Sequence, residues 1–148
     1  MTQIYRLKAV VGPVQEIGDG LAGRRRVVPL AGGTFTGPEL NGNLVPGGSA
    51  TWQLVSPDGS VVTEVRYTLQ TDRGALLYVE SSGIGQANDA RSAPAGPARD
   101  IDQGEPLLHV TTRIETASPE LSWLNKAVYV TVAQRTTVSW LYETYLVG

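Results

Sequence analysis

Four polar side chains alternate along one segment in a pattern that could support acid–base chemistry. His109, Thr111, Arg113 and Glu115 are each separated by one residue. In a β-strand they would share one face, with neighbours roughly 7 Å apart. An imidazole, a guanidinium and a carboxylate on one face are the groups needed for general acid–base catalysis on a carbonyl or hydroxyl. We therefore expect Glu115 to face the interior of the fold as a base, with His109 on the same face.

The orientation of this segment has an alternative. The apolar residues between the charged ones, such as Val110 and Ile114, could fill the core while the charged face meets water. Glu64 and Arg66 pose the same question. A buried pair would clamp a substrate carboxylate or enolate, whereas an exposed pair would be ordinary surface. Arg66 completes the candidate catalytic set with His109 and Glu115.

Aromatic side chains are abundant enough to line a ligand pocket in addition to a core. A flat apolar ligand would pack against them, although core packing is the alternative for each one. Asn125 could donate a hydrogen bond to a substrate oxygen or instead cap a local turn. The candidate substrate-binding residues are Trp52, Tyr67, Tyr78, Arg113, Trp123, Asn125 and Tyr142.

The composition excludes several classes of function. Without cysteine the chain has no disulfide, thiolate nucleophile or iron–sulfur site, and its single histidine argues against a metal centre. No Walker loop, Gly-x-Ser-x-Gly or His-Glu-x-x-His motif is present, so we expect no cofactor and no metal. A net charge of −2, with one basic run at Arg24–Arg26, does not suit nucleic acid. No apolar stretch suits a membrane span or a secretory signal, so we expect a cytoplasmic protein.

The elements that must position these residues are short strands. The 17 glycines and 9 prolines punctuate alternating apolar runs, which is typical of strands and turns. The clearest hairpin joins Val61–Gln70 to Ala75–Glu80 through the turn Thr71–Gly74. Other predicted strands are Ile4–Val11, Arg25–Leu30, Thr34–Thr36, Leu44–Val45, Thr51–Val55, Leu107–Thr116, Ala127–Ala133 and Val138–Val147.

Two segments depart from the strand pattern. Ser81–Pro106 lacks periodic apolar residues and is predicted to be a long loop, either a lid over a site or an excursion. Ser118–Leu124 is predicted to form one helical turn, with Ser118 as its N-cap and Pro119 at the first helical position.

From the number and spacing of the strands, we expect residues 1–148 to form a single all-β domain. We expect a closed antiparallel barrel of about eight to ten strands, with more than about 45% strand.

Six motifs then occur in a characteristic order. They are Gly32–Pro38, Pro46–Gly48 with Trp52–Gln53, Arg66–Asp72, Gly74–Val79, Glu115–Thr116 and Trp123–Asn125. Together they resemble the DUF3237 family, also called UPF0311, from about Val10 to Tyr145. The resemblance implies a small β-barrel similar to the allene oxide cyclase and dirigent barrels, which bind apolar metabolites and steer cyclisation or coupling; this is analogy at the level of the fold.

The chain also departs from the family pattern. Thr51 stands where the family usually has an aspartate before the tryptophan, and Leu108–His109 stands where it has an aromatic residue followed by arginine. Ile114 and Leu121 replace further aromatic residues. If the family site uses that aspartate and arginine, the substrate or activity of this chain differs from that of its relatives.

Three functions remain open. The first is a cofactor-independent enzyme that acts on a small hydrophobic carbonyl, enone or phenolic metabolite in a barrel pocket, by hydration or elimination, isomerisation or cyclisation. The second is a lipocalin-like protein that binds such an apolar or aromatic ligand without turnover, and the third is a structural barrel with a filled lumen. We also expect a homodimer, because the predicted strands Ala127–Ala133 and Val138–Val147 carry apolar residues on both faces.

Overall fold

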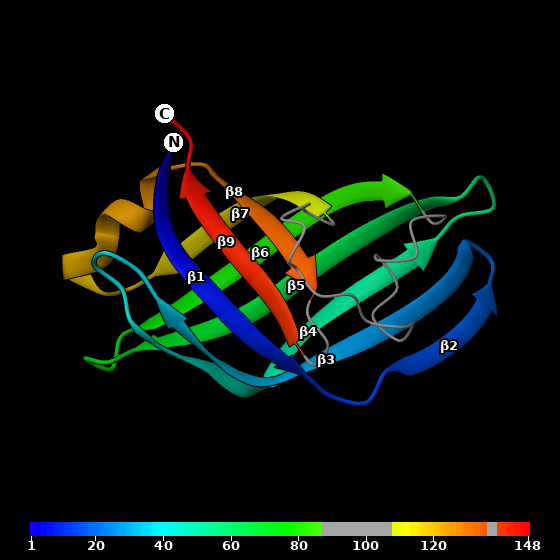
Figure 1. Ribbon diagram of the computed structural model, residues 1–148, viewed down its shortest axis with the longest axis horizontal. Coiled ribbons are helices and arrows are strands. Elements are labelled where there is room, and N and C mark those ends of the chain that lie inside the picture. Colours follow the sequence, from blue (N-terminus) through cyan, green and yellow to red (C-terminus); the bar gives the residue numbers. More distant parts are fainter. Residues whose placement is uncertain (87–107, 136–138) are drawn as a thin grey trace.

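The computed structural model describes residues 1–86, 108–135 and 139–148 of the chain, and these form a β-barrel (Figure 1). Strand accounts for 73% of the described residues, which confirms the all-β prediction. The strands within the described ranges are β1 (Thr2–Val11), β2 (Gln15–Gly20), β3 (Gly23–Thr36), β4 (Gly42–Val55), β5 (Ser60–Thr71), β6 (Leu76–Gln86), β7 (Leu108–Thr116), β8 (Tyr129–Arg135) and β9 (Ser139–Leu146). A short 3-10 helix, η3 (Pro119–Lys126), lies between β7 and β8.

Eight of these strands close into an antiparallel barrel. The order along the sheet is β1-β9-β8-β7-β6-β5-β4-β3-β2, and a further pairing between β1 and β3 closes it. The C-terminal part of β3 pairs with β1, while its N-terminal part pairs with β2, which is therefore an additional strand outside the closed ring. The β1–β3 contact needs Gly33, because a Cβ atom there would collide with the backbone carbonyl of Lys8.

The hairpin of β5 and β6 matches the sequence prediction closely. The alternate residues of β5 are buried, and they are Val61, Thr63, Val65, Tyr67 and Leu69. The turn places Gly74 at a φ of +90°, in the left-handed region that glycine adopts without strain. Its backbone N–H donates to the carbonyl of Thr71 at 2.9 Å, which closes the turn.

Some predicted boundaries were wrong. Residues 81–86 continue β6 instead of starting a loop, because they pair in register with the first residues of β5. The remainder of the predicted loop, residues 87–106, lies outside the described residues. β2 was not predicted, since its residues are mostly exposed and carry no apolar alternation. Ser118 does occupy the N-cap position of η3, but its side chain makes no capping hydrogen bond.

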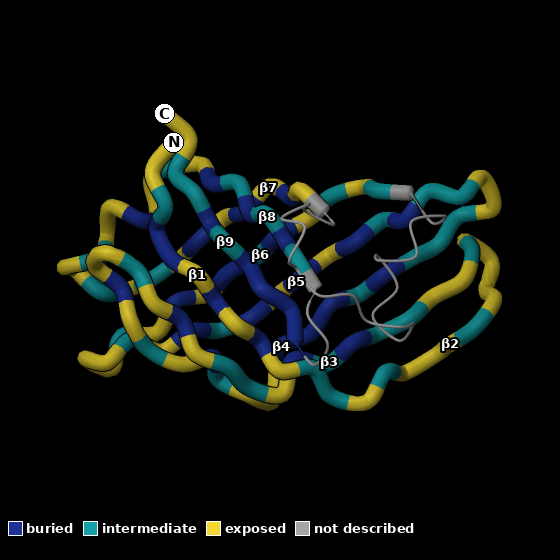
Figure 2. The backbone as a smooth tube through the Cα atoms, in the orientation of Figure 1, coloured by how far each residue is buried: buried dark blue, intermediate teal, exposed yellow. Residues whose placement is uncertain are grey.

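The core lies inside the barrel, where buried stretches of all walls meet (Figure 2). The largest fully buried side chains include Tyr5, Tyr67, Tyr129 and Phe35. Several inward positions are polar, because the alternation of the strands places serine and threonine there as well as apolar residues. Among the described residues, no helix is long and apolar enough to cross a membrane.

Candidate functional site

The acid–base row on β7 faces outward. His109, Arg113 and Glu115 are exposed, whereas Val110 and Ile114 between them are buried. The expectation that Glu115 faces the barrel interior is therefore wrong, since 63% of its side chain is exposed and it pairs with Arg113 at 3.8 Å. Strand alternation allows only one set inside, and burying the apolar set avoids the cost of desolvating three charged or polar groups.

Arg66 also lies on the outer wall, at the centre of a polar cluster. Its guanidinium carbon lies 5.2 Å from the centre of the Trp52 ring, and its Nη2 lies 3.4 Å from Glu64 Oε2. Glu80 is 3.9 Å from Arg66 Nε and accepts a hydrogen bond from the Tyr78 hydroxyl at 2.9 Å. Each of these exposed contacts contributes little to stability.

The outer wall thus collects most of the residues predicted for the site. The six on this wall are Trp52, Arg66, Tyr78, His109, Arg113 and Glu115. The register joins them across strands, because Arg66 pairs with Glu80, Glu80 pairs with Arg113, and Tyr78 pairs with Glu115. Five of the six are thus brought together on the outer surface, where the charged groups form ion pairs with one another. His109 lies farther along β7, opposite Val132.

Tyr67 and Tyr142 lie inside the barrel, as a lumen site requires. Their rings are 5.9 Å apart, and Tyr142 stacks on Trp140 with an interplanar angle of 14°. The Tyr142 hydroxyl approaches Thr51 Oγ1 at 3.4 Å. Position 51 of β4, where the resemblance expects aspartate, therefore lies in the interior beside an aromatic pair.

A chain of buried hydroxyl groups crosses four neighbouring strands of the interior. Ser81, Thr112, Thr131 and Thr144 are linked in turn at 2.8, 2.6 and 2.8 Å. Thr144 in turn hydrogen-bonds with Tyr5, so the chain continues onto β1. This network was not predicted, although serine and threonine at alternate strand positions were a signal for it.

The interior tyrosines are neutral donors rather than bases. Burial raises the pKa of Tyr5 and of Tyr142 to about 12, and it raises the pKa of Tyr67 well above its usual range. The buried polar side chains of the described interior are otherwise serine, threonine and glutamine, so no described carboxylate or imidazole is available there as a base. The buried hydroxyl groups at the centre of the barrel hydrogen-bond with one another.

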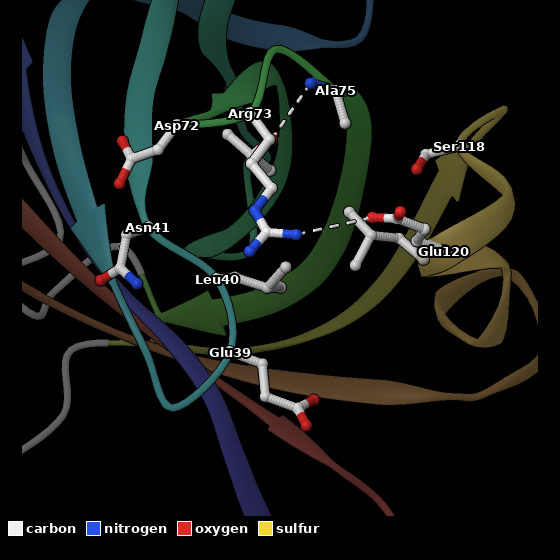
Figure 3. Close-up of a pocket in the computed structure, with 10 residues that line it drawn as sticks. Glu39, Leu40, Asn41, Asp72, Arg73, Ala75, Ser118 and Glu120 are labelled. Atoms are coloured by element: carbon white, nitrogen blue, oxygen red, sulfur yellow. Dashed lines mark hydrogen bonds and ion pairs between the residues drawn. The ribbon is translucent and has the colours of Figure 1, made fainter.

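An open cavity of about 410 Å³ lies at the end of the barrel that carries η3 (Figure 3). Three segments that are distant in the sequence form it: residues 39–41 before β4, residues 71–75 in the β5–β6 turn, and residues 118–121 at the start of η3. Leu40, Ala75 and Leu121 give it an apolar part, and the other lining residues are Glu39, Asn41, Thr71, Asp72, Arg73, Ser118 and Glu120. We call this cavity the η3 pocket.

Backbone hydrogen bonds hold the rim of the η3 pocket. The Asp72 N–H donates to the carbonyl of Asn41 at 2.8 Å, which ties the β5–β6 turn to the segment before β4. Within the turn, the Ala75 N–H donates to Thr71 Oγ1 at 3.0 Å. On the far side, the Tyr129 hydroxyl donates to the carbonyl of Leu124 at 3.0 Å and anchors η3 to the barrel. These hydrogen bonds fix the three segments of the rim relative to one another.

The charges of the η3 pocket face one another across it. Arg73 Nη1 lies 3.9 Å from Glu120 Oε2, and Figure 3 shows the guanidinium reaching across the pocket toward that carboxylate. Glu39 and Asp72 add two carboxylates to the rim. Hydrogen-bond donors and acceptors thus surround the apolar part of the pocket. Among the described residues, no three His, Cys, Asp or Glu side chains form a group that could hold a metal.

The last two predicted binding residues, Trp123 and Asn125, lie close to this end. Trp123 lines a second cavity of about 240 Å³, which lies against the same Glu39–Leu40 segment as the η3 pocket. Asn125 does not point into either cavity. Its Oδ1 accepts from the Thr116 N–H at 2.8 Å and its Nδ2 donates to the Thr116 carbonyl at 3.0 Å. Asn125 thus forms a clamp that joins the end of η3 to the end of β7.

Comparison with known proteins places this fold in a family. The family model described as a protein of unknown function, DUF3237, matches residues 1–147. The chain belongs to the DUF3237 family. A UPF0311 protein of Rhodopseudomonas palustris is 31% identical over 138 residues, covering 89% of this chain and 86% of that protein.

Solved structures of similar proteins share the barrel. A protein of unknown function from Clostridium acetobutylicum superimposes with a TM-score of 0.83 at 26% identity, covering 99% of this chain and 95% of the other. A β-barrel-like protein from Acinetobacter baumannii has a TM-score of 0.76 at 32% identity, with 98% and 93% covered. Because DUF3237 is described without an activity, function has to be argued from the sites of this chain.

Proposed function

We propose that this protein binds a small amphipathic metabolite with a carbonyl or phenolic oxygen in the η3 pocket. The observation that carries the proposal is a preformed cavity of about 410 Å³ with an apolar part and a polar rim. Ligand pockets usually span about 300–1,000 Å³ and combine apolar lining with a few polar groups. The inner face of the barrel, where we first expected the ligand, carries no described carboxylate or imidazole to act as a base.

The rim supplies the groups that such a ligand needs. Arg73 offers several N–H donors for a carbonyl or phenolic oxygen. Asp72 and Glu39 accept hydrogen bonds from ligand hydroxyl groups, while Leu40 and Leu121 contact its apolar part. An aromatic ring that extends past Glu39 would reach the neighbouring cavity beside Trp123.

A second candidate function is acid–base catalysis in the same pocket, without a cofactor. The observation that favours it is the pairing of Glu120 with Arg73 across the cavity at 3.9 Å. A carboxylate can abstract or return a proton while a guanidinium stabilises the developing oxyanion, as hydration, elimination, isomerisation or cyclisation requires. Both side chains are largely exposed, so little water is excluded, and binding is the function that the geometry supports first.

The test compares two exposed arginines, each of which forms an ion pair with a glutamate. Arg73→Ala removes the pocket guanidinium, whereas Arg113→Ala removes one from an exposed ion pair of the outer wall. A panel of phenolic and enone compounds is screened by thermal shift, and hits are measured by calorimetry. We expect at least tenfold weaker binding for Arg73→Ala and unchanged binding for Arg113→Ala. Equal affinities in both variants would contradict the proposal.

The catalytic candidate has its own test. A panel compound that binds is incubated with the protein, and its conversion is followed by chromatography. If the compound turns over, Glu120→Gln should lower the rate about 10²–10⁴-fold and leave binding nearly intact, because the shape remains and the base is lost. Binding without conversion across the panel would favour the carrier.

The homodimer and the cytoplasmic location remain part of the proposal. Val128 is exposed and Val130 and Val132 are partly so, and they share the outer face around β8 as expected for a self-associating surface. Light scattering at high micromolar concentration should report twice the monomer mass, and a monomer there would contradict this expectation. A chain without cysteine has no requirement for an oxidising compartment, which supports the cytoplasm.

A further inference from the structure

A row of polar residues crosses the inner face of the sheet at the end of the barrel away from η3. Arg26 of β3 pairs with Gln53 of β4, and Gln53 pairs with Thr63 of β5. Figure 1 shows β3, β4 and β5 extending here beyond the ends of β1 and β9. Adjacent strands are about 4.8 Å apart, so the row spans roughly 10 Å.

The row faces inward. Gln53 and Thr63 are each only 2% exposed, and the next inward residues on the first two strands, Val28 and Thr51, are also buried. The adjacent residues Arg25 on β3 and Glu64 on β5 point outward and are exposed. Strand alternation thus places an arginine, an amide and a hydroxyl side by side on the inner face of the sheet.

The charge of Arg26 is only partly compensated. Its side chain is 13% exposed, and its ion-pair partner among the described residues, Glu16, lies 3.6 Å from Nη1 and is itself 42% exposed. The Nε atom is buried and finds no hydrogen-bond acceptor in the described part of the chain. Burial lowers the pKa of Arg26, and Glu16 offsets this in part. An unsatisfied buried guanidinium N–H is costly, so it marks a place where an anionic acceptor would bind favourably.

An aromatic surface lies beside the row. Thr51 is two residues from Gln53 on the inner face of β4, and its hydroxyl approaches that of Tyr142. Tyr142 in turn stacks on Trp140. A ligand with its anionic end at Arg26 would direct the rest of its structure toward aromatic groups, which favours a flat ring over an inorganic anion.

We propose that Arg26, Gln53 and Thr63 form a binding site for the carboxylate of a small aromatic acid. The guanidinium Nε–H and an Nη–H donate in parallel to the two carboxylate oxygens, the geometry in which arginine recognises carboxylates best. The Thr63 hydroxyl gives a further hydrogen bond, and Gln53 lies between Arg26 and Thr63 in the row. This site lies at the opposite end of the barrel from the η3 pocket and does not depend on the function proposed there.

The experiment uses benzoate as the probe and a neighbouring arginine as the control. Arg26→Gln and Arg25→Gln change the net charge equally, but only Arg26 lies on the inner face. Titration is followed by nuclear magnetic resonance of backbone amides. We expect benzoate to shift the amides around Thr63 and Gly83, with at least tenfold weaker binding in Arg26→Gln and unchanged binding in Arg25→Gln. Benzamide, which has the same ring and no charge, should bind at least tenfold more weakly than benzoate.

Further variants separate this site from a structural role and from the η3 pocket. Arg26→Lys keeps the charge without the planar donor pair, so weaker benzoate binding in that variant supports the site even if Arg26→Gln does not fold. Arg73→Ala should bind benzoate like the wild type. Equal benzoate affinity in wild type, Arg26→Gln and Arg25→Gln, shifts confined to the amides of Asn41 and Asp72, or no saturable binding by the wild type would each overturn the proposal.

Discussion

The hydroxyl oxygens of Tyr5 and Tyr67 lie 2.5 Å apart in the centre of the barrel. Tyr5 belongs to β1 and Tyr67 to β5, which are not neighbours in the sheet, so the contact links opposite walls through the lumen. Both side chains are almost completely buried. A polar contact at this place requires both groups to stay protonated, because an ionised phenolate would be buried without a counter-ion.

The buried tyrosines predict a loss of stability at high pH. The pKa of Tyr5 and of Tyr142 is about 12 in the folded chain, above the value of 10.0 for an unperturbed tyrosine. The unfolded chain therefore releases these protons first, so the stabilisation is complete below pH 10 and is lost as pH rises toward 12. The loss is on the order of 2–3 kcal/mol for each group at pH 12. Urea unfolding at a series of alkaline pH values measures it.

A substitution assigns part of that loss to one residue. Tyr142→Phe keeps the ring and its stacking on Trp140 but removes the titrating hydroxyl, so it should flatten the alkaline decline. Tyr78→Phe is the comparison, because Tyr78 is exposed and donates to Glu80 at the surface. A decline of the same steepness in wild type and Tyr142→Phe would contradict this explanation.

The chain of buried hydroxyl groups predicts that removing one of its members lowers the stability of the fold. Thr131→Val keeps the shape of the side chain but removes the group that links Thr112 to Thr144. Both neighbours then lose a partner inside the barrel, which should lower the free energy of unfolding by about 1–3 kcal/mol. The control is Thr34→Val on the exposed face of β3, where we expect a change within about 0.5 kcal/mol. Chemical denaturation that ranks the two variants equally would show that the chain is energetically unimportant.

The outward orientation of Glu115 reverses the expectation from the sequence. Glu115→Gln should leave the free energy of unfolding within about 0.5 kcal/mol of the wild type, because it weakens only an exposed pair with Arg113. Ligand affinity at the η3 pocket should also be unchanged, since Glu115 is not among the residues that line it. A tenfold or greater change in affinity, measured by calorimetry, would return Glu115 to the candidate site.

Strand alternation shows which residues share a face, but it identifies the inner face only where the two faces differ clearly in polarity. On β5 the inward set contains Val65, Tyr67 and Leu69, whereas the sequence left open whether this set or the one with Glu64 and Arg66 faces inward. On β7 the family-like Glu115 favoured the wrong face, although Val110 and Ile114 pointed to the right one. The decisive energy there is the burial of apolar side chains, which a motif does not report.

The η3 pocket could not be predicted from local patterns. Its lining comes from residues 39–41, 71–75 and 118–121, which meet only because the barrel closes and brings a turn, a loop and a helix to one end. The turn at Thr71–Gly74 was predicted correctly, but no local pattern pointed to a functional role for Asp72 or Arg73. Likewise the sequence shows Arg26 only as part of the basic run Arg24–Arg26, because its inward orientation depends on the register with β4.

The clamp between Asn125 and Thr116 connects the stability of η3 with the pocket. Asn125→Ala removes two hydrogen bonds that join the end of η3 to Thr116 at the end of β7. Thr116 and Asn125 flank Ser118–Leu121, the segment that forms one wall of the η3 pocket. We expect the free energy of unfolding to fall by about 1–2 kcal/mol and the Thr116 amide to exchange its hydrogen faster. Ligand affinity at the η3 pocket should fall several-fold, because the wall formed by the start of η3 is then less well ordered. Asn125→Asp keeps the acceptor for the Thr116 N–H and loses only the donor, so its stability and affinity should lie between those of Asn125→Ala and the wild type.

The control is Asn43→Ala, at an exposed asparagine of β4, which should change neither hydrogen exchange at Thr116 nor ligand affinity. If Asn125→Ala accelerates exchange at Thr116 while affinity stays at the wild-type level, the clamp serves the fold alone and the start of η3 does not shape the bound ligand.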